Sequence, residues 1–93
     1  AEVMSIESFN HVCRLTLSDG KQLETSAKLS DLYERLRENS QFIFPHRTYI
    51  VNMEYIRGIS GAEILMTDGR QFPISRKGYS DVKAAYLDYI TRL

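Results

Sequence analysis

The sequence has no tryptophan, a single cysteine, two prolines and no net charge, and each shortage narrows what the chain can do. Cys13 cannot form an internal disulfide, and its alternating, strand-like surroundings predict a half-buried thiol in a reducing, cytoplasmic compartment. The 12 basic and 12 acidic side chains cancel, so bulk charge gives no argument for nucleic-acid binding. No apolar run approaches the roughly 18 residues of a membrane span, and no pattern indicates a signal peptide.

The sequence also lacks the motifs that indicate a catalytic or metal-binding site. Cys13 has no local activating motif, and His11 and His46 lie too far apart in the sequence for metal-ligand spacing. The chain contains no glycine-rich phosphate loop and no serine in a nucleophile elbow. We therefore expect no enzyme, no catalytic or metal-binding residue and no cofactor.

The 93 residues, 43% of them hydrophobic, are enough to bury one modest core. We expect a single domain over residues 1–93. The sequence opens at Ala1 without an initiator methionine and becomes β-like almost at once, so we expect a domain cut from a longer protein.

Alternating apolar and polar residues predict strands over residues 3–9 and 12–18, separated by a short polar break at Asn10-His11. Asp19-Gly20 and Asp68-Gly69 each lie between two strand-like runs. Both dipeptides predict β-hairpins with type I′ turns, in which the two central residues have positive φ. Pro73 lacks an N–H and is expected near a strand end or on a sheet edge.

Helical spacing appears in two segments. Apolar residues at 29, 32, 33 and 36 predict a first helix, with Ser26 as a candidate N-cap. A second apolar stripe, from Val82 to Leu93, predicts a helix that begins after Gly78. The order of elements indicates a mainly β, α+β fold.

The run from His46 to Asn52 surrounds an apolar β-prone core with polar groups. Pro45 is expected to end a strand over residues 42–44 and to expose the polar pair that follows. Arg47 on such a corner could make a bidentate contact to guanine O6 and N7 or pair with phosphate. The alternative is a solvated surface arginine that pairs with a carboxylate such as Glu54.

For four further polar residues, a structural role is weighed against contact with DNA. His46 is expected to orient the turn, and Asn52 to close a turn on its own backbone. The hydroxyls of Thr48 and Ser75 suit phosphate oxygens, although local backbone bonding would explain them equally well.

The Asn10-His11 loop is either a second group of base-contacting residues or an ordinary polar turn. Any basic patch must be local. Between Arg47 and Lys77 the basic residues are Arg47, Arg57, Arg70, Arg76 and Lys77, and the acids of this stretch, Glu54, Glu63 and Asp68, are expected on another face.

Residues 42–52, with Ile56, Ile59, the Asp68-Gly69 hairpin and residues 73–76, resemble the LytTR family of bacterial DNA-binding domains. The resemblance covers nearly the whole chain and implies elongated antiparallel β-sheets with two short helices, in which loops enter successive major grooves. It implies base contacts from Arg47, Arg76 and either Asn10 or His11. Thr48, Ser75 and Lys77 would lie near phosphates.

Many members of this family are response regulators of two-component systems with an N-terminal receiver domain, which is the partner domain we expect. Phe44 and Pro45 depart from the family pattern, which often has an arginine and an apolar residue there. The surface is therefore expected to be less cationic than usual and to bind weakly as a monomer. Homodimers on direct-repeat or palindromic sites would increase affinity.

The function predicted from the sequence is sequence-specific binding of double-stranded DNA by a bacterial transcription regulator. The alternative is a protein-interaction or dimerisation module that recruits a strand to an exposed β edge without binding DNA, and the zero net charge motivates it.

Overall fold

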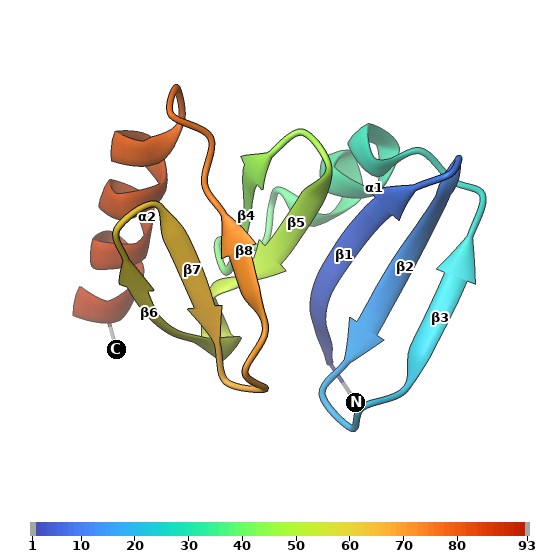
Figure 1. The fold of residues 1–93 in the computed structure, drawn as a ribbon, viewed down its shortest axis with the longest axis horizontal. Helices are drawn as coiled ribbons and strands as arrows, with labels where there is room; N and C mark the ends of the chain where they lie inside the picture. The colour runs from blue at the N-terminus through green and yellow to red at the C-terminus, as the bar shows by residue number, and fades with distance from the viewer. Residues whose placement is uncertain (1, 93) are drawn as a thin grey trace.

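The chain forms two antiparallel sheets and two α-helices in the computed structural model, which describes residues 2–92 (Figure 1). The large sheet contains, in spatial order, β3 (Gln22–Thr25), β2 (Val12–Leu17), β1 (Val3–Phe9), β5 (Tyr49–Asn52) and β4 (Phe42–His46). The small sheet contains β6 (Ile56–Ser60), β7 (Glu63–Met66) and β8 (Gln71–Pro73). The mainly β, α+β class predicted from the sequence is confirmed.

The two faces of the large sheet belong to different cores. On one face Ile6, Cys13 and Ile50 pack against α1 (Leu29–Leu36). On the other face Tyr49 and Val51 join a cluster built mainly from the small sheet and α2 (Tyr79–Thr91). The small sheet therefore packs against the large one, and the principal extents are 33, 29 and 25 Å. The elongation implied by the resemblance is slight.

The break between β1 and β2 is a tight hairpin turn. Phe9 pairs with Val12, which leaves only Asn10 and His11 in the loop. Their φ angles are 48° and 64°, and a type I′ turn requires positive φ at both central residues. Asparagine and histidine are both found in this conformation more often than most residues, although any side chain adopts it at some cost relative to glycine.

The two Asp-Gly hairpins form as predicted, but their turn type was wrongly predicted. Only the glycines have positive φ, +89° at Gly20 and +91° at Gly69. The Gly20 N–H donates to the carbonyl of Leu17 over 2.9 Å, which makes a three-residue loop that ends in a left-handed glycine. The aspartate carboxylate accepts the N–H two residues later, as in Lys21 N–H to Asp19 Oδ1 at 3.0 Å, and this bond favours the longer loop.

The two helices begin in different ways. Lys28 is the N-cap of α1 and gives no side-chain cap, so the expectation that Ser26 caps this helix was wrong. Thr25 instead accepts the N–H of Ala27 and closes the turn before the helix. Helix α2 begins after Gly78 as predicted and packs Val82 into the second core.

Pro45 does not end its strand. Strand β4 continues through this residue to His46, with an irregular register between Ile43 and His46. Because β4 is an edge strand of the large sheet, a residue without an N–H is tolerated there. Pro73 likewise lies at the end of β8, on the edge of the small sheet.

Candidate nucleic-acid interface

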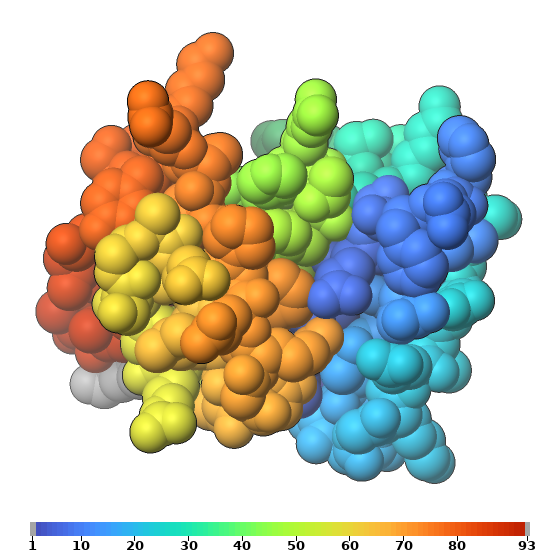
Figure 2. Space-filling model, in the orientation of Figure 1, coloured from blue at the N-terminus to red at the C-terminus, as the bar shows by residue number. Residues whose placement is uncertain are grey.

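Three segments that are far apart in the sequence project from one edge of the molecule (Figure 1). They are the β1–β2 turn, the β4–β5 turn and the segment between β8 and α2, and the space-filling view shows them as separate protrusions (Figure 2). We call this the three-turn edge and define it by Asn10, His11, Arg47, Thr48, Ser75, Arg76 and Lys77. All of these side chains are exposed except that of Ser75, which is half-buried, and none is acidic.

The central turn is closed by His46. Its Nδ1 atom accepts the backbone N–H of Thr48 over 3.3 Å and lies 2.9 Å from the Thr48 hydroxyl. The imidazole is stacked parallel to the ring of Tyr49, with 5.3 Å between centroids and 1° between planes. His46 is therefore held within the corner, while Arg47 between these residues is exposed.

Arg47 forms no ion pair within residues 2–92. Glu54, the carboxylate considered as its partner, instead accepts a hydrogen bond from the hydroxyl of Tyr89. A guanidinium that is exposed and unpaired keeps all five donors available for an external acceptor. Its planar fork matches phosphate oxygens or the O6 and N7 atoms of guanine.

Backbone hydrogen bonds connect the central turn to both neighbouring segments. The Ser8 N–H, near the end of β1, donates to the carbonyl of Thr48 over 2.7 Å. On the other side the Ser75 N–H donates to the carbonyl of Pro45 over 3.4 Å. The central turn is therefore bonded closely to β1 and, through a longer bond, to the segment before α2.

The segment between β8 and α2 exposes Arg76 and Lys77 next to an N-terminal helix end. The Ser75 hydroxyl accepts the N–H of Gly78 over 3.2 Å, the local backbone bond that was one alternative for this residue. A Cβ at Gly78 would lie only 3.1 Å from Ser75 Oγ, so glycine permits this close turn. Because Ser75 accepts there, its O–H remains free to donate to an anion.

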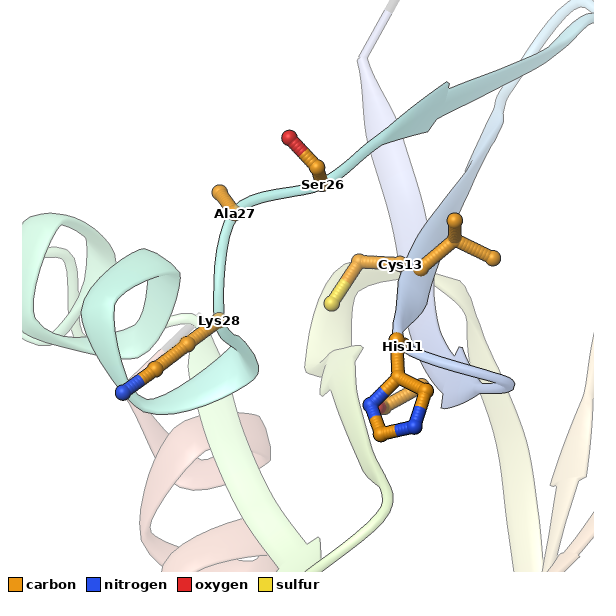
Figure 3. Close-up of a pocket in the computed structure, with 7 residues that line it drawn as sticks. His11, Cys13, Ser26, Ala27 and Lys28 are labelled. Carbon is orange, nitrogen blue, oxygen red and sulfur yellow. The ribbon is translucent and has the colours of Figure 1, made fainter.

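His11, in the turn between β1 and β2, lines an open cavity of about 280 Å³ (Figure 3). The Sγ atom of Cys13 faces the segment 26–28 across this cavity, and His11 lies on the same side of β2. Cys13 is buried, not half-buried as the sequence suggested. Burial raises the pKa of its thiol, and a smaller opposing effect comes from a hydrogen bond with Ser8. A protonated, buried thiol fits a packing role.

Asn52 lies at the end of β5 that is remote from Thr48, and its side chain is buried. Its Oδ1 atom accepts the N–H of Glu54 at 2.9 Å and Nε2 of Gln41 at 3.1 Å. Its Nδ2 donates to the carbonyl of Val3 over 2.8 Å. These bonds close the turn into the 3₁₀ helix Met53–Tyr55 and tie β5 to the start of β1, so Asn52 stabilises the scaffold.

Arg70 is not part of an exposed basic patch. Its guanidinium is directed into the seam between the sheets, where it contacts Ser5, Thr16 and Asp68. Sequence patterns gave no signal for the contacts with Ser5 and Thr16, because these residues lie more than fifty positions from Arg70. The two-residue loop between Phe9 and Val12 did contain a signal for the type I′ turn, since asparagine favours its first central position.

Within residues 2–92 no three His, Cys, Asp or Glu side chains are grouped so as to hold a metal ion. Over the same part of the chain, no helix has the length and apolar character needed to cross a membrane.

A sequence model of the family described as the LytTr DNA-binding domain matches residues 1–86. The chain belongs to the LytTR family. Its fold is similar to that of a solved LytTr DNA-binding domain from a Bacillus cereus protein described as a methyl-accepting/DNA response regulator, with a TM-score of 0.74 and 23% sequence identity. That match covers 92% of this chain and 81% of the other. A comparison with curated proteins found no match.

LytTR membership establishes that this is a domain of a DNA-binding family, with the mainly β architecture seen here. The seven residues that define the three-turn edge, which are those for which the sequence suggested a DNA contact, belong to three turns on one side of the molecule. His46 and Asn52, the two residues assigned an orienting role, are both hydrogen-bonded, His46 within the central turn and Asn52 at the remote end of β5.

Proposed function

We propose that this domain binds double-stranded DNA at specific sites and that the three-turn edge reads successive major grooves. The observation that carries the proposal is the row of separate, exposed turns along one edge, with unpaired Arg47 at its centre. The long axis of the molecule measures 33 Å, close to the roughly 34 Å of one B-DNA helical repeat. The three turns follow one another along this axis, within that length (Figure 1).

Each turn is assigned at least one base contact. Arg47 and Arg76 donate to guanine O6 and N7, the commonest arginine contact in a major groove. The β1–β2 turn supplies one further base contact, from Asn10 to adenine N6 and N7 or from the His11 imidazole. Both residues are exposed at the tip of the hairpin, which suits entry into a groove.

Phosphate contacts are assigned to Thr48, Ser75 and Lys77. Lys77 contributes charge, and Ser75 has a free O–H to donate. The Thr48 hydroxyl lies 2.9 Å from His46 Nδ1. To donate to a phosphate oxygen, this hydroxyl has to rotate away from the imidazole. On a duplex without the specific site, the cationic side chains Arg47, Arg76 and Lys77 can neutralise three phosphates, which gives an expected salt slope of about −3 in log K against log salt.

The biological setting follows from the same proposal. We infer that the domain is the output module of a bacterial transcriptional regulator with an N-terminal receiver. With few phosphate contacts, a single domain binds weakly. Two copies on a direct-repeat or palindromic site bind more tightly, because the second contact becomes intramolecular.

Fluorescence anisotropy over a salt series tests the proposal. We expect binding to a random duplex at low salt that weakens with a slope of about −3 as salt rises. We also expect tighter binding to a duplex recovered by in vitro selection. An absence of binding to either duplex at low salt would reject the proposal.

The second candidate, a β-edge interaction module, is favoured by strand β3. This strand forms a free edge of the large sheet, and Leu23 on it is 54% exposed. Free N–H and C=O groups on such an edge can pair with another strand. Self-association without DNA, abolished by Leu23→Lys, would favour this candidate. A monomer at all concentrations without DNA would exclude self-pairing.

A further inference from the structure

Arg70 joins the two sheets through side-chain hydrogen bonds. It follows the β7–β8 turn of the small sheet, and its Nη2 donates to Ser5 Oγ on β1 over 2.7 Å. Its Nη1 donates to Thr16 Oγ1 on β2 over 3.2 Å and lies 3.6 Å from the Glu7 carboxylate. Its Nε donates to Asp68 Oδ2 over 2.8 Å, within its own hairpin. The guanidinium therefore contacts both sheets at once.

The surroundings of Arg70 make these bonds hard to replace. The Ser5 side chain has no exposed surface, and Thr16 is buried, so water is largely excluded from both hydroxyls. Asp68 fixes the third side of the guanidinium, which then presents its fork in one orientation. A lysine ammonium at this position could not reproduce that planar geometry.

Because the Arg70 contacts lie far from the three-turn edge, a change there would alter how the turns of the edge are placed relative to one another. The β7–β8 turn lies at the opposite edge of the molecule from the three turns (Figure 1). The large sheet carries the Asn10-His11 and Arg47-Thr48 turns, whereas Arg76 follows the last strand of the small sheet. A change in the angle between the sheets at Arg70 would therefore move Arg76 relative to both other turns.

Elsewhere the sheets contact each other mainly through apolar side chains, and one further side-chain bond, from the Tyr55 hydroxyl before β6 to Glu2 before β1 over 2.7 Å, joins two exposed groups. Near Arg47 the seam is apolar, with Tyr49 against Phe72 at 4.8 Å between ring centroids. Apolar contacts are non-directional and permit small rotations. The nearest direct bond between the turns, from Ser75 N–H to Pro45 O, is long at 3.4 Å.

We propose that Arg70 is a positioning residue for DNA recognition: by bonding Ser5 and Thr16 across the seam, it sets the spacing between the Arg76 contact and the other two contacts. The spacing part of this inference rests on the proposed function. Arg70 itself touches no DNA, because its guanidinium is directed into the seam. The two turns on the large sheet keep their mutual spacing without it.

Spacing variants of the selected DNA site test this assignment. Selections with Arg76→Ala, Arg47→Ala and His11→Ala first show which part of the site each turn contacts. One base pair is then inserted either between the Arg76 and Arg47 sub-sites or between the Arg47 and His11 sub-sites. Affinities are measured for wild type, Arg70→Met and Arg57→Met, in which the control replaces an exposed arginine of the same small sheet.

Wild type and Arg57→Met should lose about tenfold or more in affinity with either insertion, which corresponds to roughly 1.4 kcal/mol. Arg70→Met should tolerate the insertion next to the Arg76 sub-site, with a loss of at most about threefold, and still reject the other insertion. A general loss of stability would weaken binding to all duplexes without changing these ratios. Unchanged ratios, or equal relaxation at both positions, would overturn the proposal.

A second measurement needs no DNA. Spin labels at Lys21 on the large-sheet side and at Glu63 on the small sheet, both exposed, report the distance between the sheets in a Cys13→Ala background. Arg70→Met should broaden or shift the distance distribution, and Arg57→Met should leave it unchanged. An unaltered distribution in Arg70→Met would show that Arg70 does not fix the arrangement of the two sheets. An altered distribution in a domain that binds no duplex would reject only the proposed function. Arg70→Lys takes the place of Arg70→Met if the latter does not fold.

Discussion

The Nδ1 atom of His46 lies 2.9 Å from the hydroxyl of Thr48 and also accepts the Thr48 backbone N–H. One imidazole therefore spans the turn that presents Arg47, and its other contact is the parallel ring of Tyr49. His46 and Thr48, on either side of Arg47, are hydrogen-bonded to each other, whereas the Arg47 side chain is exposed.

Replacing His46 with phenylalanine should separate these two contacts. The aromatic stack on Tyr49 can persist, whereas the acceptor for the Thr48 N–H is lost. We expect the free energy of unfolding to fall by about 0.5–1.5 kcal/mol, the usual contribution of one hydrogen bond. Urea denaturation measures this change. Thr48→Ala, which keeps the backbone N–H, should lose less, and a fully stable His46→Phe variant would contradict the closing role.

Replacing His11 with glycine should raise stability, while removing an imidazole that is a candidate base contact. Its φ of 64° is unfavourable for a residue with a side chain, so His11→Gly should relieve strain. After allowing for the greater freedom of glycine in the unfolded chain, we expect a gain of roughly 0.5 kcal/mol. His11→Ala, the matched control, keeps the strain and also lacks the imidazole. Both variants should bind DNA alike, and a His11→Gly variant less stable than His11→Ala would contradict this account.

Tyr49→Phe should stabilise the domain. The Tyr49 hydroxyl is buried and has no hydrogen-bond partner among residues 2–92. An unsatisfied buried hydroxyl costs about 1–3 kcal/mol, so its removal should raise the free energy of unfolding by about 1 kcal/mol. The contacts of the ring with His46 and Phe72 are retained. Chemical denaturation provides the measurement, and a less stable Tyr49→Phe variant would show that the hydroxyl is satisfied in solution.

Tyr89 should make stability depend on alkaline pH. Its hydroxyl donates to the Glu54 carboxylate, and this bond raises the pKa of Tyr89 to about 12 from the ordinary value of 10.0. A pKa raised in the folded state stabilises the protein below pH 10, and that stabilisation is lost as pH rises towards 12. Tyr89→Phe should flatten this decline in urea denaturation measured at successive pH values. The remaining slope is expected from Tyr49, whose pKa is raised by burial, and from Tyr55, whose pKa is raised by its hydrogen bond with Glu2. An identical slope in wild type and variant would exclude the assignment.

The sequence predicted those parts of the fold that depend on neighbouring residues. Alternation over residues 3–9 and 12–18 and the two Asp-Gly dipeptides identified the hairpins, because strand period and turn chemistry are local properties. The same local signals could not decide between turn types. Asp19 bonds the N–H of Lys21, which favours a three-residue loop over the expected type I′ turn.

The parts that escaped prediction depend on long-range contacts. The bond from Ser8 to Thr48 forms only because β1 pairs with β5. No repeat or residue spacing in the sequence predicts that pairing. Arg70 looked like one more basic surface residue, yet its partners Ser5 and Thr16 lie on the other sheet. The candidate contact residues were accessible to sequence reasoning, whereas the bonds that hold their turns in register were not.

The most direct test of the account is in vitro selection of duplex sites by wild type, Arg47→Ala and Arg76→Ala. Wild type should recover one defined site. Each variant should fold normally and lose its preference at one position only, a different position for each arginine, at a cost of about 1–3 kcal/mol. If both variants recover the wild-type site with wild-type affinity, Arg47 and Arg76 do not read bases and the central claim is wrong.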